Sequence, residues 1–224
     1  PFCLKETKVN LKIPRDIAKG SIALTDARLI TLDDRKVIKR GSIVTHNGRI
    51  TCVGRCKTTQ ADKIISLKGK TVIPGWVDTH AHHTSVEGND GIFPQHRASS
   101  AAYLAYGVTT VFDPASGPIN PFVLGELISS GRIIGPRTFP TGTALTSCRA
   151  DDQIHELGSF KGAENHINRL AKLGAISIKD YKQCTRLQRT WLAEAARQRG
   201  VSLTSEGSDL NYFLGLMMTG HAGF

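Results

Sequence analysis

The sequence lacks the features that mark membrane and nucleic-acid-binding proteins. None of its 224 residues falls in an apolar run of about 18 or more, so we expect no transmembrane helix. Aromatic residues make up only 6% of the chain, and the lysines and arginines are scattered without forming a basic block. The formal charge of +10 is therefore better explained by a basic surface than by a nucleic-acid partner.

Cysteine is also scarce, and no Cys-x-x-Cys motif is present. The five cysteines are Cys3, Cys52, Cys56, Cys148 and Cys184. The second and third are four residues apart and could pair, but nothing in the sequence requires it. We expect free thiols, and the cysteines do not fix a cellular compartment.

The first third of the chain is rich in β-forming residues. Residues 1–20 predict an extended linker, and residues 23–30 and 41–54 alternate as short strands do. Asn47-Gly48 lies between two β-rich runs, which is a strong local signal for a hairpin turn. Residues 62–70 lead from these strands to the next part of the chain.

From residue 71 onward, apolar strands alternate with helical segments that end at glycine. Strands are predicted over residues 71–83, 108–112, 137–142, 175–181 and 201–206, with a sixth beginning near Ala222. Helices are predicted over residues 97–106, 120–130, 163–173, 190–200 and 210–219. This alternation is typical of parallel βαβ units and predicts the α/β class.

A histidine cluster ends the first of these strands. The run from Thr71 is broken by Pro74-Gly75, resumes at Trp76, and ends in His80, His82 and His83. Side chains alternate faces along a strand, so His80 and His82 should point the same way and His83 the opposite way. Two such imidazoles can bind one divalent metal, although a bare His-x-His is also common at polar strand ends.

The run Pro74-Gly-Trp-Val-Asp-Thr-His-Ala-His82 resembles the opening barrel strand of the amidohydrolase superfamily, which includes imidazolonepropionases and dihydroorotases. The resemblance extends from about Gly20 to the last residue. It implies a small β-sandwich over residues 21–70, followed by a (β/α)8 TIM barrel. Such a barrel takes roughly 250 residues. We therefore expect residues 71–224 to be its N-terminal part, truncated, and the isolated chain to be inactive.

Catalytic groups of a parallel barrel lie at the C-terminal ends of its strands. That rule selects His80, His82, Asp113, Lys179 and Glu206. A lysine at a strand end is usually a solvated cation. In many amidohydrolases, however, a lysine in a similar place is carbamylated and bridges two metals, which implies a catalytic, metal-bridging role for Lys179.

Glu206 stands where most members of the superfamily have a metal-binding histidine. It can be a ligand, an anchor for one, or a sign that a single metal is bound. A branch often fused to a TolB-like β-propeller has glutamate at this place, so an upstream propeller is an expected partner domain. That branch also has a counterpart of Lys179-Asp-Tyr181, followed by paired arginines.

Other site residues follow from the same resemblance. It implies one or two Zn²⁺ ions held by His80, His82, Lys179 and Glu206, with His83, Asp113 and Tyr181 as candidate pocket residues. His221 stands at the start of the predicted sixth strand, so we interpret it as a strand-entry residue. The branch's sixth-strand histidine and eighth-strand aspartate would fall beyond Phe224.

The sequence thus predicts a metal-dependent hydrolase that cleaves carbon–nitrogen bonds of a small molecule through a metal-activated water. The bond would be an amide, either dipeptide-like or cyclic, and a homo-oligomer is compatible with this function. The alternative is a non-catalytic binding module with a degenerate metal site, which the departure at Glu206 permits. The two differ in whether the protein binds Zn²⁺ and hydrolyses amides.

Overall fold

The computed structural model describes residues 9, 12, 14–33, 36–83, 97–147, 157–206 and 210–223. The chain divides into two compact units. The first contains Pro1–Pro74 with Ser130–Arg132, and the second contains Gly75–Ser129 with Ile133–Phe224. Most of the predicted linker, together with Cys3 and Cys148, lies outside the described residues.

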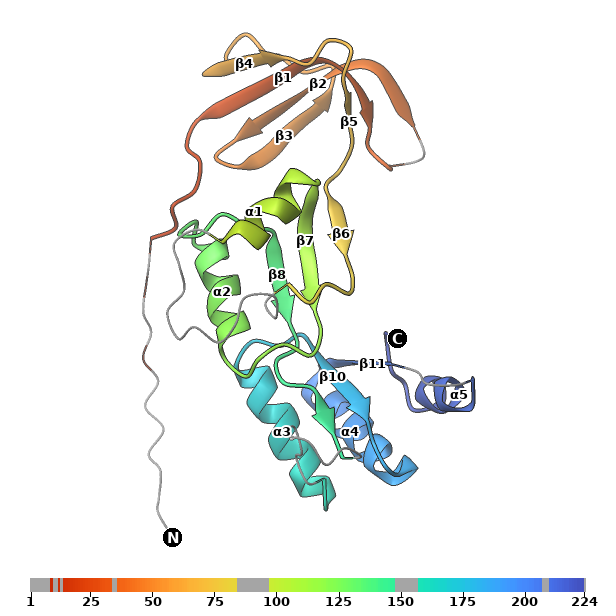
Figure 1. The fold of residues 1–224 in the computed structure, drawn as a ribbon. Helices are drawn as coiled ribbons and strands as arrows, with labels where there is room; N and C mark the ends of the chain where they lie inside the picture. The colour runs from red at the N-terminus through yellow and green to blue at the C-terminus, as the bar shows by residue number, and fades with distance from the viewer. Residues whose placement is uncertain are drawn as a thin grey trace. The chain divides into compact units, whose positions relative to one another are not determined.

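The first unit is built on one mixed sheet of five strands with the order β3-β2-β1-β4, in which β5 also pairs with β1 (Figure 1). The strands are β1 (Ser21–Ile30), β2 (Val37–His46), β3 (Arg49–Gly54), β4 (Lys63–Ser66) and β5 (Thr71–Val72). The pairs β1–β2 and β2–β3 are antiparallel, whereas β4 and β5 run parallel to β1. Asn47 and Gly48 have φ angles of 49° and 73°, which confirms the predicted hairpin turn.

An irregularity lies within β1, whose two halves pair with different parallel strands. The register with β2 shifts after Leu24, and Asp26 has a φ angle of 61°. The first half of β1 pairs with β4, and Arg28 and Leu29 pair with β5. The described strands of the first unit therefore form one sheet, and the β-sandwich expected over residues 21–70 stays a prediction.

The free-thiol expectation is wrong for three of the cysteines, namely Cys52, Cys56 and Cys184. Cys52 on β3 and Cys56 just after it form a disulfide that closes a short loop. Cys184 is disulfide-bonded as well. A spacing of four residues permits such a bridge without demanding it, so the sequence alone left the pairing open.

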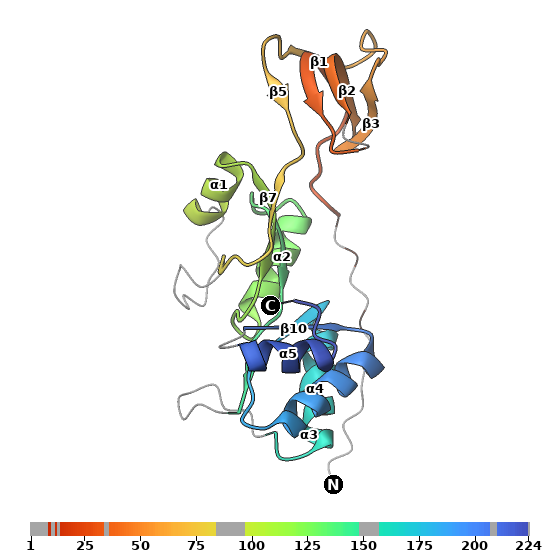
Figure 2. The same ribbon diagram turned by 90° about the vertical axis from the view of Figure 1, so that its right-hand side faces the viewer.

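The second unit alternates parallel strands with helices (Figures 1 and 2). The elements are β6 (Trp76–Asp78), α1 (Ala98–Ala105), β7 (Val108–Asp113), α2 (Asn120–Ser129), β8 (Arg137–Pro140), β9 (Leu145–Thr146), α3 (Phe160–Lys172), β10 (Ser177–Lys182), α4 (Arg186–Arg199), β11 (Ser202–Ser205) and α5 (Leu210–Met218). The sheets have the orders β6-β7-β8 and β11-β10-β9, and every described pairing in them is parallel. A parallel bridge between Thr204 and Gly223 begins the predicted sixth strand. These are the elements of a partial (β/α)8 barrel, so the predicted α/β class is confirmed.

The helix ends follow local chemistry. Helix α4 begins four residues before the predicted Thr190, because Thr185 and Gln188 form a capping box. It ends at Gly200, whose φ of 72° places the backbone in the left-handed region. None of the described helices combines the length and the apolar composition needed to cross a membrane.

The core of the second unit lies where α3 and α4 pack on the sheet that contains β10. Ile167 and Leu170 of α3, Leu192 of α4 and Ile178 of β10 are all fully buried in one apolar cluster. Full burial of a Leu or Ile side chain contributes about 1.5–3 kcal/mol. Lys179 directly follows Ile178 on β10.

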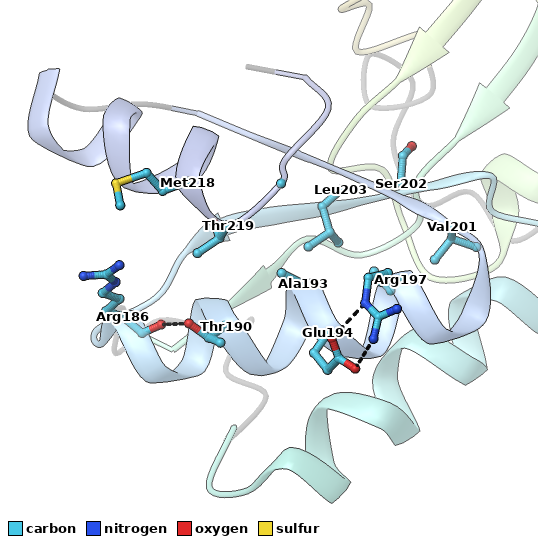
Figure 3. Close-up of a pocket in the computed structure, with 12 residues that line it drawn as sticks. Arg186, Thr190, Ala193, Glu194, Arg197, Val201, Ser202, Leu203, Met218 and Thr219 are labelled. Carbon is cyan, nitrogen blue, oxygen red and sulfur yellow. Dashed lines mark hydrogen bonds and ion pairs between the residues drawn. The ribbon is translucent and has the colours of Figure 1, made fainter.

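A cavity of about 510 Å³ lies between α4, β11 and α5 (Figure 3). Arg186 and Thr190 of α4 line one side of it, and Met218 lines another. The residues around it include none of those predicted for the metal centre. The cavity is therefore separate from that centre.

Candidate metal centre

The two histidines predicted to bind metal lie just beyond the end of strand β6, in the loop that follows it. Strand β6 ends at Asp78, and the Asp78 Oδ1 atom accepts a hydrogen bond of 3.0 Å from the His80 backbone N–H. The predicted alternation persists in the loop, because His80 and His82 are exposed whereas His83 is fully buried. The sequence thus predicted the directions of these side chains correctly and the end of the strand incorrectly.

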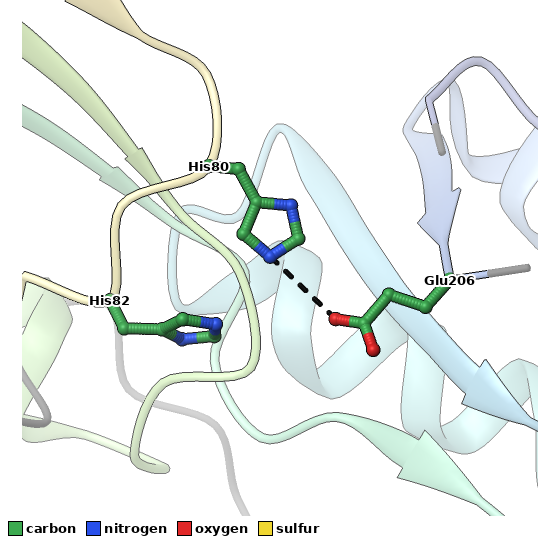
Figure 4. A group of neighbouring side chains, drawn as sticks. All are labelled: His80, His82 and Glu206. Carbon is green, nitrogen blue, oxygen red and sulfur yellow. Dashed lines mark ion pairs between the residues drawn. The ribbon is translucent and has the colours of Figure 1, made fainter.

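His80, His82 and Glu206 form a compact group of donor atoms (Figure 4). One ligand atom from each residue lies within 4.8 Å of the other two. The two imidazole centroids are 5.2 Å apart with an interplanar angle of 70°, and His80 Nε2 is 3.6 Å from Glu206 Oε1. Glu206 immediately follows β11, so the structure brings a loop near residue 80 together with the end of a strand more than 100 residues later.

Lys179 completes this group from β10. Its side chain is 0% exposed, and its Nζ atom donates a hydrogen bond of 2.9 Å to Glu206 Oε1. The side chain of Glu206 is 39% exposed, so the ion pair joins a buried cation to a partly hydrated anion. All four predicted metal-binding residues are therefore in one place.

The charges around this group favour the protonation states that bind metal. Burial raises the pKa of Glu206, but the hydrogen bond from Lys179 and the charges of Lys179 and His80 outweigh it and lower the pKa overall. Burial lowers the pKa of His80, and the positive charge of Lys179 lowers it further. The carboxylate therefore stays ionised and the imidazole stays neutral, with a lone pair available to a cation.

The three predicted pocket residues, His83, Asp113 and Tyr181, differ in how far they are buried. Asp113 ends β7 and is 0% exposed, as is His83, so neither presents surface to a solvent-filled pocket. Tyr181 is partly buried on β10, and the Nζ atom of Lys182 lies 5.3 Å from its ring centroid. His83 and Asp113 thus belong to the packed interior next to the candidate centre.

A buried polar network near Lys179 was not predicted. His221 Nε2 lies 2.9 Å from Asp180 Oδ2, and neither side chain has any exposed surface. Thr219 Oγ1 is 3.0 Å from His221 Nδ1, and Gln183 Nε2 donates to Asp180 Oδ1 at 2.7 Å. His221 therefore lies in the interior, where it contacts Asp180 of β10. Its partner Asp180 follows Lys179 directly, but no sequence signal links residues 41 positions apart.

Several curated proteins are similar to part of this chain, whereas no family model matches it. A 5'-deoxyadenosine deaminase of Methanosarcina mazei is 40% identical over 64 residues, which is 28% of this chain and 15% of that protein. An imidazolonepropionase of Micrococcus luteus is 32% identical over 91 residues, covering 39% of this chain and 22% of its own length. The alignments thus span less than a quarter of these relatives.

Solved structures are similar over most of the chain. A putative prolidase from Bifidobacterium longum matches 92% of it with a TM-score of 0.74 and 20% identity. A Xaa-Pro dipeptidase with bound methionine matches 90%, with a TM-score of 0.74 and 18% identity. The chain covers 53% and 60% of these two proteins, and identities this low show the fold alone. Together, the sequence relatives and the shared fold support membership of the amidohydrolase superfamily.

Proposed function

We propose that the protein is a metal-dependent hydrolase that cleaves carbon–nitrogen bonds of small molecules. The observation that carries this proposal is the grouping of His80, His82 and Glu206 within 4.8 Å, with Lys179 hydrogen-bonded to Glu206. Three elements distant in sequence deliver these side chains to one point. A chance polar strand end would not recruit partners from β10 and β11.

The donor set fits a divalent transition metal such as Zn²⁺. Imidazole and carboxylate ligands bind Zn²⁺ at about 2.0–2.2 Å, so tetrahedral donors lie roughly 3.4 Å apart. The present atoms lie within 4.8 Å, so rotation of partly exposed side chains would bring them to bonding distance. The lowered pKa values of His80 and Glu206 favour the same binding-competent states.

Lys179 has a specific role in this proposal. As an ammonium it repels a cation, which gives a physical reason for its modification. The neutral amine attacks CO₂, the new N–C bond forms a carbamate, and one proton leaves to solvent. The product is an anion that can bridge two metals, and complete burial protects it from water. One or two ions would then be held, depending on whether this carbamate forms.

The bound metal would supply Lewis acidity, which polarises a carbonyl oxygen and lowers the pKa of a nearby water toward about 7. The protein residues orient and tune this centre. The hydrogen bond from Lys179 keeps Glu206 ionised, and the Asp78 carboxylate fixes the backbone at His80. His80 and His82 are exposed, so a small substrate can reach the centre from solvent.

An amide is the proposed substrate class, either dipeptide-like or cyclic. The relatives named above comprise a deaminase and an imidazolonepropionase, and the structural neighbours comprise a prolidase and a dipeptidase. All of these names describe reactions at carbon–nitrogen bonds. The common chemistry is water attack at a carbon bonded to nitrogen, and we propose the same chemistry for the intact protein.

Metal binding is the first test. Purified protein is dialysed with Zn²⁺ and its metal content measured in the wild type and in the His80→Ala and His82→Ala variants. We expect bound metal in the wild type and a loss of at least about a hundredfold in affinity when either ligand is removed. His46→Ala is the matched control, because His46 is an exposed histidine of the first unit.

Unchanged metal content in both ligand variants would refute the assignment. Activity is then measured on the intact protein with a panel of dipeptides and cyclic amides, before and after chelation. Metal-dependent release of the amine supports the hydrolase. A protein that folds stably without metal and hydrolyses none of these compounds would instead be a binding module.

A further inference from the structure

The loop that carries His80 and His82 is tied down at several backbone positions. After β6, the His80 N–H donates to Asp78 Oδ1, and the Ala81 N–H donates to the Phe112 carbonyl of β7 at 2.9 Å. The His83 N–H then donates to the Ala81 carbonyl at 2.7 Å, which closes a tight turn. The two exposed ligands therefore project from a short segment that is held at both ends.

The His83 side chain forms the second anchor of this segment. It is 0% exposed, and its Nε2 atom lies 3.0 Å from Ser100 Oγ on α1. Its Nδ1 atom lies 3.5 Å from Thr138 Oγ1 on β8, and its ring meets the edge of Tyr103 at 5.1 Å between centroids. One side chain thus joins the loop to helix α1, which follows it, and to strand β8, three elements further along.

The neighbouring hydrogen bonds fit one tautomer of His83. The Thr138 hydroxyl donates to the Pro136 carbonyl at 3.0 Å, so its oxygen offers a lone pair toward His83 Nδ1. A neutral imidazole protonated at Nδ1 satisfies Thr138 and leaves Nε2 to accept from the Ser100 hydroxyl. Ser100 is itself fully buried. The imidazole is therefore suited to a structural role and is not presented to solvent.

We propose that His83 is a positioning residue for the metal centre, fixing the backbone from which His80 and His82 project. This inference rests on the proposed metal binding. A loop without this anchor would sample more conformations, and the entropy lost on binding would then oppose metal capture. Groups that orient metal ligands typically contribute 10–100-fold to affinity, and we expect the same range for His83.

The test is a Zn²⁺ titration against a chromophoric chelator, performed on the chain and its variants. His83→Ala should bind Zn²⁺ about 10–100-fold more weakly than the wild type, with the same number of ions at saturation. Ser100→Ala should weaken binding less. The double variant should be no weaker than His83→Ala alone, because both substitutions remove the same contact.

Ile167→Ala is the control for a merely structural effect. Ile167 is fully buried in the core of the same unit, on α3. The Ile167→Ala substitution should lower the melting temperature and leave Zn²⁺ affinity unchanged. If His83→Ala fails to fold, Ser100→Ala takes its place in the test. A lower Zn²⁺ affinity in Ser100→Ala, without an equal loss in Ile167→Ala, supports the positioning role of His83.

The outcomes separate this inference from the function on which it rests. Absence of Zn²⁺ binding by the wild type would overturn the metal centre and the positioning role together. Zn²⁺ binding by the wild type with unchanged affinity in His83→Ala and Ser100→Ala would overturn the positioning role alone. An equal loss in Ile167→Ala would also overturn it, since general destabilisation would then explain the effect.

Discussion

The two units of the chain place their charged groups differently. In the first unit, the ion pair between Arg40 and Asp26 lies at the surface, with side chains 81% and 32% exposed. In the second, Asp180 and His221 pair with no exposed surface on either side chain, and Lys179 is equally buried beside its partner Glu206. Buried polar and charged groups cost free energy unless they are paired, so each of these interior groups in the second unit has a partner close to it.

The units also differ in how far apart in sequence their partners lie. Strands β1, β2 and β3 pair in order through short turns, so local sequence determines most of this sheet. In the second unit, parallel pairs require a helix between strands, and the candidate metal-binding residues come from positions as distant as His80 and Glu206. Substitutions that affect the metal centre should therefore be separable from those that affect the first sheet.

The largest expected effect comes from the buried pair next to Lys179. Asp180→Ala leaves the His221 and Gln183 side chains without their shared acceptor. Loss of one partner from such a network should reduce the free energy of unfolding by about 3 kcal/mol. Urea denaturation measures this loss. Asp180→Asn keeps one acceptor oxygen and should lose less, whereas equal losses in the two variants would contradict the hydrogen-bond explanation.

Lys179→Met separates metal binding from stability. The variant cannot form a carbamate, so we expect Zn²⁺ affinity to fall by about a hundredfold, which corresponds to about 2.7 kcal/mol. The free energy of unfolding of the metal-free protein should change by less than about 1 kcal/mol. The reason is that Glu206, which is 39% exposed, can be rehydrated once its partner is removed.

The carbamate itself is checked in a high-resolution structure of the metal-loaded protein. Branched density continuous with the Lys179 Nζ atom is the expected result. An unmodified Lys179 that turns away from a fully occupied metal would contradict the modification, as would normal Zn²⁺ affinity in Lys179→Met.

The local features of this chain were predictable from the sequence, because short-range chemistry specifies them. The turn at Asn47-Gly48 and the left-handed Gly200 at the end of α4 both follow from residue type. The opposite directions of His82 and His83 follow from strand alternation. The four candidate metal-binding residues were predicted from places at strand ends. The structure brings them together, but it puts Lys179 inside β10 and the two histidines in the loop after β6.

The missed features depend on long-range contacts or on short segments. His221 reaches Asp180 across 41 residues, and His83 reaches Thr138 across 55, so no local pattern signals either contact. The early start of α4 depends on one capping box at Thr185, which a search for apolar periodicity overlooks. The disulfide between Cys52 and Cys56 depends on how the chain bends after β3.

Removal of that disulfide should affect the first unit alone. The bridge closes a loop between residues four apart, so the chain-entropy relation gives about 2 kcal/mol of stabilisation. The double variant Cys52→Ser/Cys56→Ser should lose about this amount in urea denaturation and retain the Zn²⁺ affinity of the wild type. A weaker Zn²⁺ affinity in the double variant would show that the two units are coupled.

The smallest effect is expected for the exposed pair in the same sheet. The hydrogen bond from Arg40 lowers the pKa of Asp26, so this carboxylate stabilises the fold when it is ionised. The contribution is present above the carboxyl's ordinary pKa of 3.8 and is lost as the pH falls through the lowered value. Arg40→Ala should therefore lower the melting temperature by at most about 2 °C at pH 7, and by less at pH 3.

Arg49→Ala is the control, because Arg49 is an exposed arginine of the same sheet without a described ion pair. The melting temperature of Asp180→Ala provides the comparison. If Arg40→Ala lowered the melting temperature as much as Asp180→Ala, the contrast between exposed and buried pairs would be wrong, because burial would then not determine what a pair contributes to stability.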